Sequence, residues 1–168
     1  DGVAAVSASR GGKIVYNGAE IGDGVVETDI RFDNERGNMA GMLFRASDPG
    51  IGRDRFRGYA VSLSSVGKKI ELTKHDNNVT LLRKVDYQFD PYTWNRLSVS
   101  MQGPEIEIFL NGKSVLKYTD EDPRYFRSGK FGLRDLVADV YYRNVGYKTA
   151  AGMKTISFEA PQGVAVSC

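Results

Sequence analysis

Residues 105–118, EIEIFLNGKSVLKY, decide the fold class of this chain. Two runs of strand length, 105–110 and 114–118, flank the dipeptide Asn111-Gly112. An Asn-Gly pair between two such runs is the strongest short-range signal for a two-residue β-hairpin, because both positions tolerate a positive φ. The segment therefore predicts a tight antiparallel hairpin.

The same pattern continues on both sides of this hairpin. In residues 25–32, Val26, Ile30 and Phe32 fall on one face, and the charged residues between them fall on the other. Further runs of this kind cover residues 42–45, 58–65, 69–75, 94–101, 130–134 and 138–147. No window of helical length carries an apolar stripe at three-and-four spacing. About ten short strands with turn residues between them predict an all-β fold, a two-sheet antiparallel β-sandwich.

Size and composition fit one globular domain. The chain has 168 residues, of which 41% are hydrophobic and 26% charged, enough for a single sizeable core. No apolar run is long enough to cross a bilayer. Because the sequence starts at Asp1 without a signal-like segment, we expect a processed or excised domain whose targeting signal, if any, lay upstream.

Charge and residue counts exclude several classes of protein. A net charge of +2 is too small to indicate a nucleic-acid or membrane partner, so any charge recognition must be local. The single Cys168 leaves no internal disulfide, and the single His75 leaves no zinc site of several His or Cys ligands. We expect a monomer without metal or cofactor.

The C-terminal segment differs from the rest of the chain. Residues 149–168 are rich in small residues and hold one strand-like piece, 155–159. The sequence therefore predicts a sandwich domain over residues 1–148 and an extension over 149–168 that docks on the same domain.

Several segments together resemble a known family. They are GVVETDIRF (24–32), AGMLFRAS (40–47), RGYAVSL (57–63), YTWNRL (92–97), IEIFLNG (106–112), GKFGLR (129–134) and YRNV (142–145). Over residues 1–148 the chain resembles the concanavalin A-like, laminin-G-like jelly-roll sandwiches of bacterial glycoside hydrolases, and among them the family 66 carbohydrate-binding modules of secreted exo-levanases. The resemblance implies a noncatalytic, extracellular module that binds the terminal fructosyl unit of levan-type fructans. It also implies a fused glycoside hydrolase that the module directs to chain ends.

The alternation places several charged residues on the outer faces of the sheets. A vicinal diol can donate to a carboxylate and accept from a guanidinium at once, so such a patch suits sugar recognition. The predicted ligand-binding residues are Glu27, Arg45, Arg57, Tyr59, Glu71, Arg134 and Tyr142. Tyr142 belongs to this set if Tyr141 and Val145 face the core. The alternative is a solvated face of ordinary cross-strand ion pairs.

Arg45 is the expected centre of that patch, with its guanidinium among Glu27, Glu71 and Arg134. Trp94, at the start of a strand, is expected in the core rather than as a platform for a sugar ring.

The long connection 47–57 is a second candidate region. It holds Arg53, Arg55 and Arg57 beside Asp54 and Phe56. Long loops on a rigid scaffold commonly carry binding residues. Three interpretations of this connection remain open. It is part of a neutral-sugar site, or a solvated loop, or a site for a sulfated glycan, which the resemblance to some laminin-G-like domains implies.

An enzymatic function is the remaining alternative. Related β-glucanases use a Glu-x-Asp-x-(x)-Glu strand, and Glu27 and Asp29 match its first two positions. The third position falls on Arg31 or Phe32, which cannot protonate a leaving group. Glu71 could supply a carboxylate from another strand, but we expect no catalytic residue.

The acidic runs 33–35 and 120–122 are the only candidates for a calcium site. Neither has the spacing of a calcium-binding loop, and both are expected to be ordinary turns.

Overall fold

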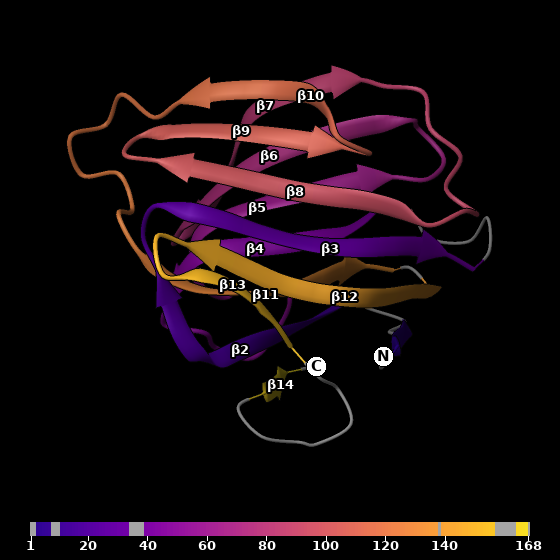
Figure 1. The fold of residues 1–168 in the computed structure, drawn as a ribbon, viewed down its shortest axis with the longest axis horizontal. Coiled ribbons are helices and arrows are strands. Elements are labelled where there is room, and N and C mark those ends of the chain that lie inside the picture. Colours follow the sequence, from indigo (N-terminus) through magenta and orange to yellow (C-terminus); the bar gives the residue numbers. More distant parts are fainter. Residues whose placement is uncertain (1–2, 8–10, 34–38, 138, 157–163, 168) are drawn as a thin grey trace.

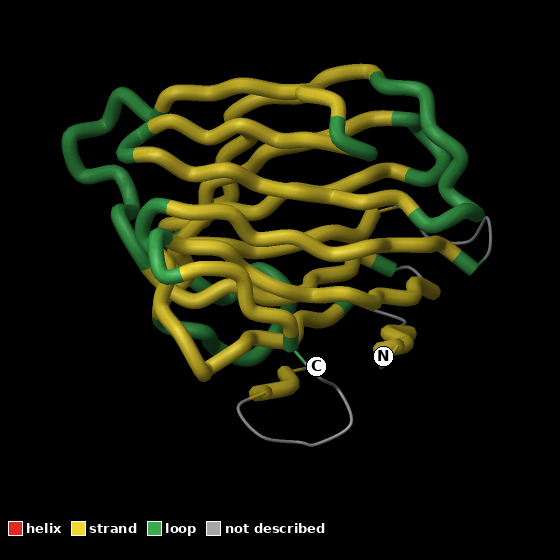
Figure 2. Tube along the Cα trace, viewed as in Figure 1, coloured by secondary structure: helices red, strands yellow, loops and turns green. Residues whose placement is uncertain are grey.

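The computed structural model describes residues 3–7, 11–33, 39–137, 139–156 and 164–167. The described residues form strands and connecting loops without a helix, so they hold no helix that could span a membrane. Fourteen strands build two layers that lie face to face, which confirms the predicted β-sandwich (Figures 1 and 2).

Within the described residues, each sheet has seven strands, and all their pairings are antiparallel. Sheet A has the order β1 (Val3–Ser7), β12 (Asp139–Thr149), β3 (Gly24–Phe32), β8 (Asn95–Gln102), β9 (Glu105–Leu110) and β10 (Lys113–Thr119), with β13 (Gly152–Thr155) paired to β12. Sheet B has the order β14 (Val164–Ser167), β2 (Gly12–Ile21), β11 (Gly129–Leu136), β4 (Met39–Ser47), β5 (Arg57–Ser64), β6 (Lys69–Asp76) and β7 (Asn78–Asp86).

The core lies between the sheets and follows the two-residue period. Val26 and Ile30 of β3 face Met42 and Phe44 of β4 across one apolar cluster, and each of these side chains is fully buried. Burying apolar side chains of this size stabilises the fold by roughly 1.5–3 kcal/mol each. This alternation is why each of the two sheets turns one apolar face toward the other.

The predicted hairpin is confirmed. Strands β9 and β10 are joined by Asn111 and Gly112, whose φ angles are 52° and 80°. Two consecutive positive φ values match the right-handed twist of the flanking strands.

Sheet B carries a second apolar layer on its outer face. There Val15, Leu43 and Ala60 cluster with Ala46 and with Phe56, which comes from the loop between β4 and β5. Strand β4 is therefore buried on both faces, as its nearly continuous apolar sequence requires. The loop consequently lies against the sheet rather than out in solvent.

The segment after residue 148 takes part in both sheets. Strand β13 pairs with β12, and β14 pairs with β2. The predicted strand over 155–159 falls mostly outside the described residues, and the described strand is the earlier β13. The domain boundary at residue 148 stays a prediction.

Candidate functional site

A groove of about 460 Å³ lies between the β4–β5 loop and the turn that joins β6 to β7. This volume is within the range of about 300–1,000 Å³ typical of small-molecule sites. We call it the loop groove, and it is lined by Asp48, Gly50, Asp54, Arg55, Phe56, Arg57, Asn77, Asn78 and Val79.

A buried lysine holds one side of the loop. Lys13 of β2 is 2% exposed, and its Nζ donates to the carbonyl oxygens of Gly50, at 2.6 Å, and Gly52. Burial lowers the pKa of Lys13, while the charge of Asp54 acts in the opposite direction. An ammonium group this far from water needs these acceptors, so the contact fixes the loop backbone.

A buried arginine holds the other side. Arg134 of β11 is 4% exposed, and its guanidinium pairs with Asp54 and donates to the carbonyl of Arg53 at 3.2 Å and to Ser62 Oγ at 3.2 Å. Burial alone would raise the pKa of Asp54, but hydrogen bonds and charge from Arg134 and Arg53 outweigh it and lower that pKa. Asp54 therefore stays ionised and paired with Arg134 and Arg53.

Beneath the groove, His75 of β6 is stacked on Phe56. Their ring centroids are 4.2 Å apart, and His75 Nε2 lies 3.0 Å from Thr73 Oγ1. His75 is 1% exposed, and no described residue gives its Nδ1 a hydrogen bond of normal geometry. Burial, and then the charge of Arg134, lower the pKa of His75 to about 4. The imidazole is thus neutral near pH 7.

This pKa predicts that stability depends on pH through His75. Above about pH 6.5 the imidazole of His75 is neutral in both the folded and the unfolded state. As the pH falls from 6.5 toward 4, His75 becomes protonated in the unfolded chain but stays neutral in the folded chain. We expect the free energy of unfolding to fall by roughly 3 kcal/mol across this window. Chemical denaturation at several pH values should show this slope in the native protein and lose it in His75→Gln. An equal pH dependence of the free energy of unfolding in the native protein and in His75→Gln would show that His75 is not its cause.

The rim of the groove is charged and accessible. Arg57 Nε lies 3.0 Å from Asp76 Oδ1, with the side chains 50% and 45% exposed. Arg55 is exposed and makes no ion pair within the described part of the chain. Val79 adds a half-exposed apolar surface beside Phe56. The groove thus offers donors, acceptors and an apolar face, which is the combination that sugar rings require.

The predicted site residues do not meet at one place. Arg57 lines the loop groove, and Arg134 lies under its loop. Glu71 shares the outer face of sheet B with Arg134, because Arg134, Gly41, Ser62 and Glu71 pair in one row across the sheet.

Glu27 lies on the opposite side of the molecule. It is on the outer face of sheet A, where Arg96 Nη1 approaches its Oε1 at 2.8 Å. A glycosidase needs two carboxyl groups roughly 5–9.5 Å apart. Glu27 and Glu71 are on the outer faces of different sheets, so they do not form such a pair.

The expected exposed position of Arg45 is wrong. A register shift follows Phe44, and Arg45 has a φ of 46° and is only 1% exposed. Its guanidinium donates to the carbonyls of Gly22 at 3.1 Å, Gly103 at 2.7 Å and Phe126 at 3.1 Å, and pairs with Asp23. Arg45 therefore ties three loops together and does not contact Glu27, Glu71 or Arg134.

Tyr59 is also buried completely. Its hydroxyl donates to Asp120 at 2.6 Å and accepts from the Phe126 backbone N–H at 3.3 Å. Burial and the neighbouring carboxylate raise the pKa of Tyr59 far above its usual value.

The expected orientation of Tyr142 is reversed. Tyr142 is in the core, with its hydroxyl 3.0 Å from the Arg134 carbonyl, whereas Tyr141 packs on Arg31 outside. A bulge in β12, with Asn144 at a φ of 52°, breaks the alternation that the sequence pattern assumed. Tyr59 and Tyr142 are therefore inaccessible to a ligand in this structure.

The expected core position of Trp94 is wrong. Trp94 is outside the core cluster, and the guanidinium of Arg143 lies 4.1 Å from its ring centroid.

The acidic runs were expected to be ordinary turns. Asp120 is engaged by Tyr59 and Lys74. In the described residues no group of three or more His, Cys, Asp or Glu side chains could hold a metal ion, and residues 34 and 35 are not among them.

The described residues form a two-sheet antiparallel β-sandwich with a groove beside the β4–β5 loop. Residues 1–148 match the model of one family, and the chain belongs to it: the 3-keto-alpha-glucoside-1,2-lyase-like domain family. A search of curated proteins gives no match.

Solved structures confirm the resemblance that the sequence predicted. The carbohydrate-binding module CBM66 from Bacillus subtilis is 21% identical, with a TM-score of 0.72 and 84% of each chain covered. A Bacillus subtilis protein with a galectin-like fold is 16% identical, with a TM-score of 0.64 over 85% of this chain and 80% of that one. The β-glucanase of Bacillus licheniformis is 11% identical, with a TM-score of 0.58 over 83% and 69%. At these identities the likeness shows a shared fold.

Proposed function

We propose that this protein is a noncatalytic carbohydrate-binding module whose loop groove takes the terminal fructosyl unit of a levan-type fructan. In this proposal the module is secreted, acts as a monomer and directs an attached glycoside hydrolase to chain ends. The observation that carries it is the groove itself, a sugar-sized hollow lined by charged, amide and apolar side chains under a loop that buried Lys13 and Arg134 hold in place.

The shape of the groove supports binding of a chain end. The β4–β5 loop and the β6–β7 turn bound its volume of about 460 Å³, so it fits one or two sugar rings rather than a long chain. Arg55 and Arg57 can donate to ring and hydroxyl oxygens, and the amides of Asn77 and Asn78 can both donate and accept. Val79, which is about half exposed, offers an apolar surface to the C–H face of a ring.

The protonation states support a binding role over glycoside hydrolysis. A general acid needs a raised pKa, whereas the pKa of Asp54 is lowered and its carboxylate is paired with Arg134. Asp76 is paired with Arg57. Asp48 is then the one carboxylate lining the groove without an ion pair to a described residue, and one carboxylate does not make a glycosidase pair.

A second candidate function is elimination at a 3-keto-glucoside, which the family description favours. Such a lyase needs an accessible base that removes the C2 proton, next to the C3 ketone, while the C1–O glycosidic bond breaks. A C1=C2 double bond forms, and the leaving group takes up a proton and departs as an alcohol. Asp48, exposed at the groove, would be that base. Product release from a 3-keto-glucoside by the native protein, abolished in Asp48→Asn, would establish this function in place of the binding role.

The test of the binding proposal is calorimetric titration with levan, inulin, β-glucan and heparin fragments. We expect levan fragments to bind, and Arg57→Ala to weaken their binding by about ten-fold to a hundred-fold, because a charge-assisted contact is lost. The melting temperature should hardly change, since an exposed ion pair such as Arg57–Asp76 contributes little.

Arg124→Ala is the matched control, because Arg124 is 92% exposed and does not line the groove. Equal affinity of Arg57→Ala and native protein for levan would contradict the proposed site. Salt-sensitive binding to heparin alone would favour the sulfated-glycan alternative.

A further inference from the structure

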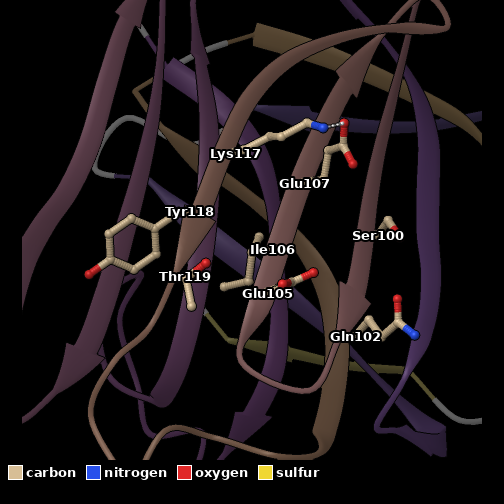
Figure 3. Close-up of a pocket in the computed structure, with 8 residues that line it drawn as sticks. All are labelled: Ser100, Gln102, Glu105, Ile106, Glu107, Lys117, Tyr118 and Thr119. Atoms are coloured by element: carbon tan, nitrogen blue, oxygen red, sulfur yellow. Dashed lines mark ion pairs between the residues drawn. The ribbon is translucent and has the colours of Figure 1, made fainter.

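The outer face of sheet A carries a hollow of its own. It has a volume of about 310 Å³ and is lined by Ser100, Gln102, Glu105, Ile106, Glu107, Lys117, Tyr118 and Thr119. Figure 3 shows these side chains on three neighbouring strands, β8, β9 and β10, with Gln102 on one side and Tyr118 on the other. We call it the sheet A hollow.

The register of the strands explains why these polar groups meet. Glu107 pairs with Ser100 on β8 and with Lys117 on β10, and Glu105 pairs with Gln102 and Thr119. Paired residues on neighbouring strands point to the same side of a sheet. Two rows of polar side chains therefore stand next to each other on the surface.

One of the two carboxylates is oriented by the protein. Glu107 Oε1 accepts from Ser114 Oγ at 2.6 Å and lies 3.2 Å from Lys117 Nζ, as the dashed line in Figure 3 marks. These contacts lower the pKa of Glu107, chiefly through the Ser114 hydrogen bond. Its second oxygen is left to accept from a ligand.

The other carboxylate is unengaged. Glu105 is exposed and has no hydrogen bond or ion pair from its side chain to any described residue. Next to it, Gln102 offers an amide that both donates and accepts. The hollow thus presents acceptors on β9 and a donor on each flanking strand, an arrangement that matches a row of hydroxyl groups.

The charges favour a neutral ligand. Glu105 and Glu107 against Lys117 leave one negative charge, and a metal ion is disfavoured because the hollow has only two carboxylates and an ammonium group occupies one of them.

The hollow also continues past Tyr118. A neighbouring hollow of about 410 Å³ is lined by Arg83, Lys117, Tyr118, Thr119 and Glu121, and three of these residues line both. The continuous surface is longer than a single sugar ring needs.

We infer that the sheet A hollow is a second carbohydrate site, which binds interior units of a neutral polysaccharide chain. It takes the ligand class of the proposed function and rests on that proposal for this class, but its residues and sheet are different. The two sites face opposite sides of the sandwich, so one molecule engages two chains of an insoluble or branched polysaccharide. Two weak sites joined in this way retain the protein much more strongly than either alone.

The experiment compares retention on immobilised levan with titration of a short levan oligosaccharide. The variants are Glu105→Gln and Gln102→Ala in the hollow, Arg57→Ala in the loop groove, and Glu20→Gln as a control. Glu20 is an exposed carboxylate of β2 that lines neither site, so Glu20→Gln makes the same charge change elsewhere.

We expect Glu105→Gln to weaken retention on the polymer by about ten-fold and to leave the affinity for the short oligosaccharide unchanged. Retention of Glu105→Gln and Gln102→Ala equal to that of Glu20→Gln would overturn the second site. If only Arg57→Ala binds less, the second site is wrong and the proposed function stands. If Glu105→Gln loses retention while Arg57→Ala changes nothing, the second site stands and the loop groove is not the binding site.

Discussion

Replacing Arg45 by alanine is expected to be the most damaging single substitution in this protein, lowering the free energy of unfolding by about 3–5 kcal/mol. The side chain is 1% exposed, and its guanidinium donates hydrogen bonds to three backbone carbonyls and pairs with Asp23. Alanine removes this donor from the three carbonyls and opens a cavity the size of the arginine side chain, whereas Asp23 keeps the Gly103 N–H as a donor.

Thermal unfolding measures this effect. For a chain of this length the loss corresponds to a drop in melting temperature of roughly 10 °C. Arg45→Lys should recover only part of the stability, because one ammonium group cannot span acceptors in three loops. Arg57→Ala, whose ion pair is exposed, is the control. A melting temperature near that of the native protein for Arg45→Ala would show that the three loops hold together without it.

Replacing Arg134 by methionine is expected to abolish carbohydrate binding in the loop groove, with an affinity loss of more than about a hundred-fold. Arg134 itself does not line the groove. It holds Asp54 and the carbonyl of Arg53, so its loss frees the loop on which the groove depends. Stability should fall by about 2–4 kcal/mol, because Asp54 then keeps only Arg53 as a partner.

A double variant separates these two effects. Arg134→Met combined with Asp54→Asn removes the uncompensated charge, so part of the stability should return while the affinity for levan stays low. Titration and thermal melts of the single and double variants measure both quantities. Native affinity in the folded single variant would show that the loop does not need Arg134.

The sheets could be predicted from the sequence because alternation of apolar and polar residues is a local property. Val26, Ile30 and Phe32 face the core as expected, and Asn111-Gly112 forms the expected turn. Alternation fails where a strand bulges, since one extra residue moves every later side chain to the other face.

Arg45 and Tyr142 illustrate this failure. Arg45 has a positive φ in a strand of otherwise regular pattern, and Tyr142 precedes the bulge at Asn144. Arg45 gives no local sign of its irregularity, whereas Asn144 is of a residue type that is enriched at positive φ.

The loop groove was predictable only in part. The length and charge of residues 47–57 pointed to Arg57, which lines the groove. The contacts that build it are distant in sequence: Lys13 reaches Gly50 across 37 residues, and Arg134 reaches Asp54 across 80. His75 is buried under Phe56, and this burial depends on how the loop packs, which the local sequence does not show.

Binding of a terminal sugar unit in the loop groove can be followed by nuclear magnetic resonance of the nitrogen-15-labelled protein during titration with a fructosyl disaccharide. We expect the largest shift changes at the backbone amides of Arg55, Phe56, Asn77, Asn78 and Val79, and we expect them to follow one saturation curve. Largest changes elsewhere in the protein, or no change at these five amides at saturating sugar, would contradict binding in the loop groove.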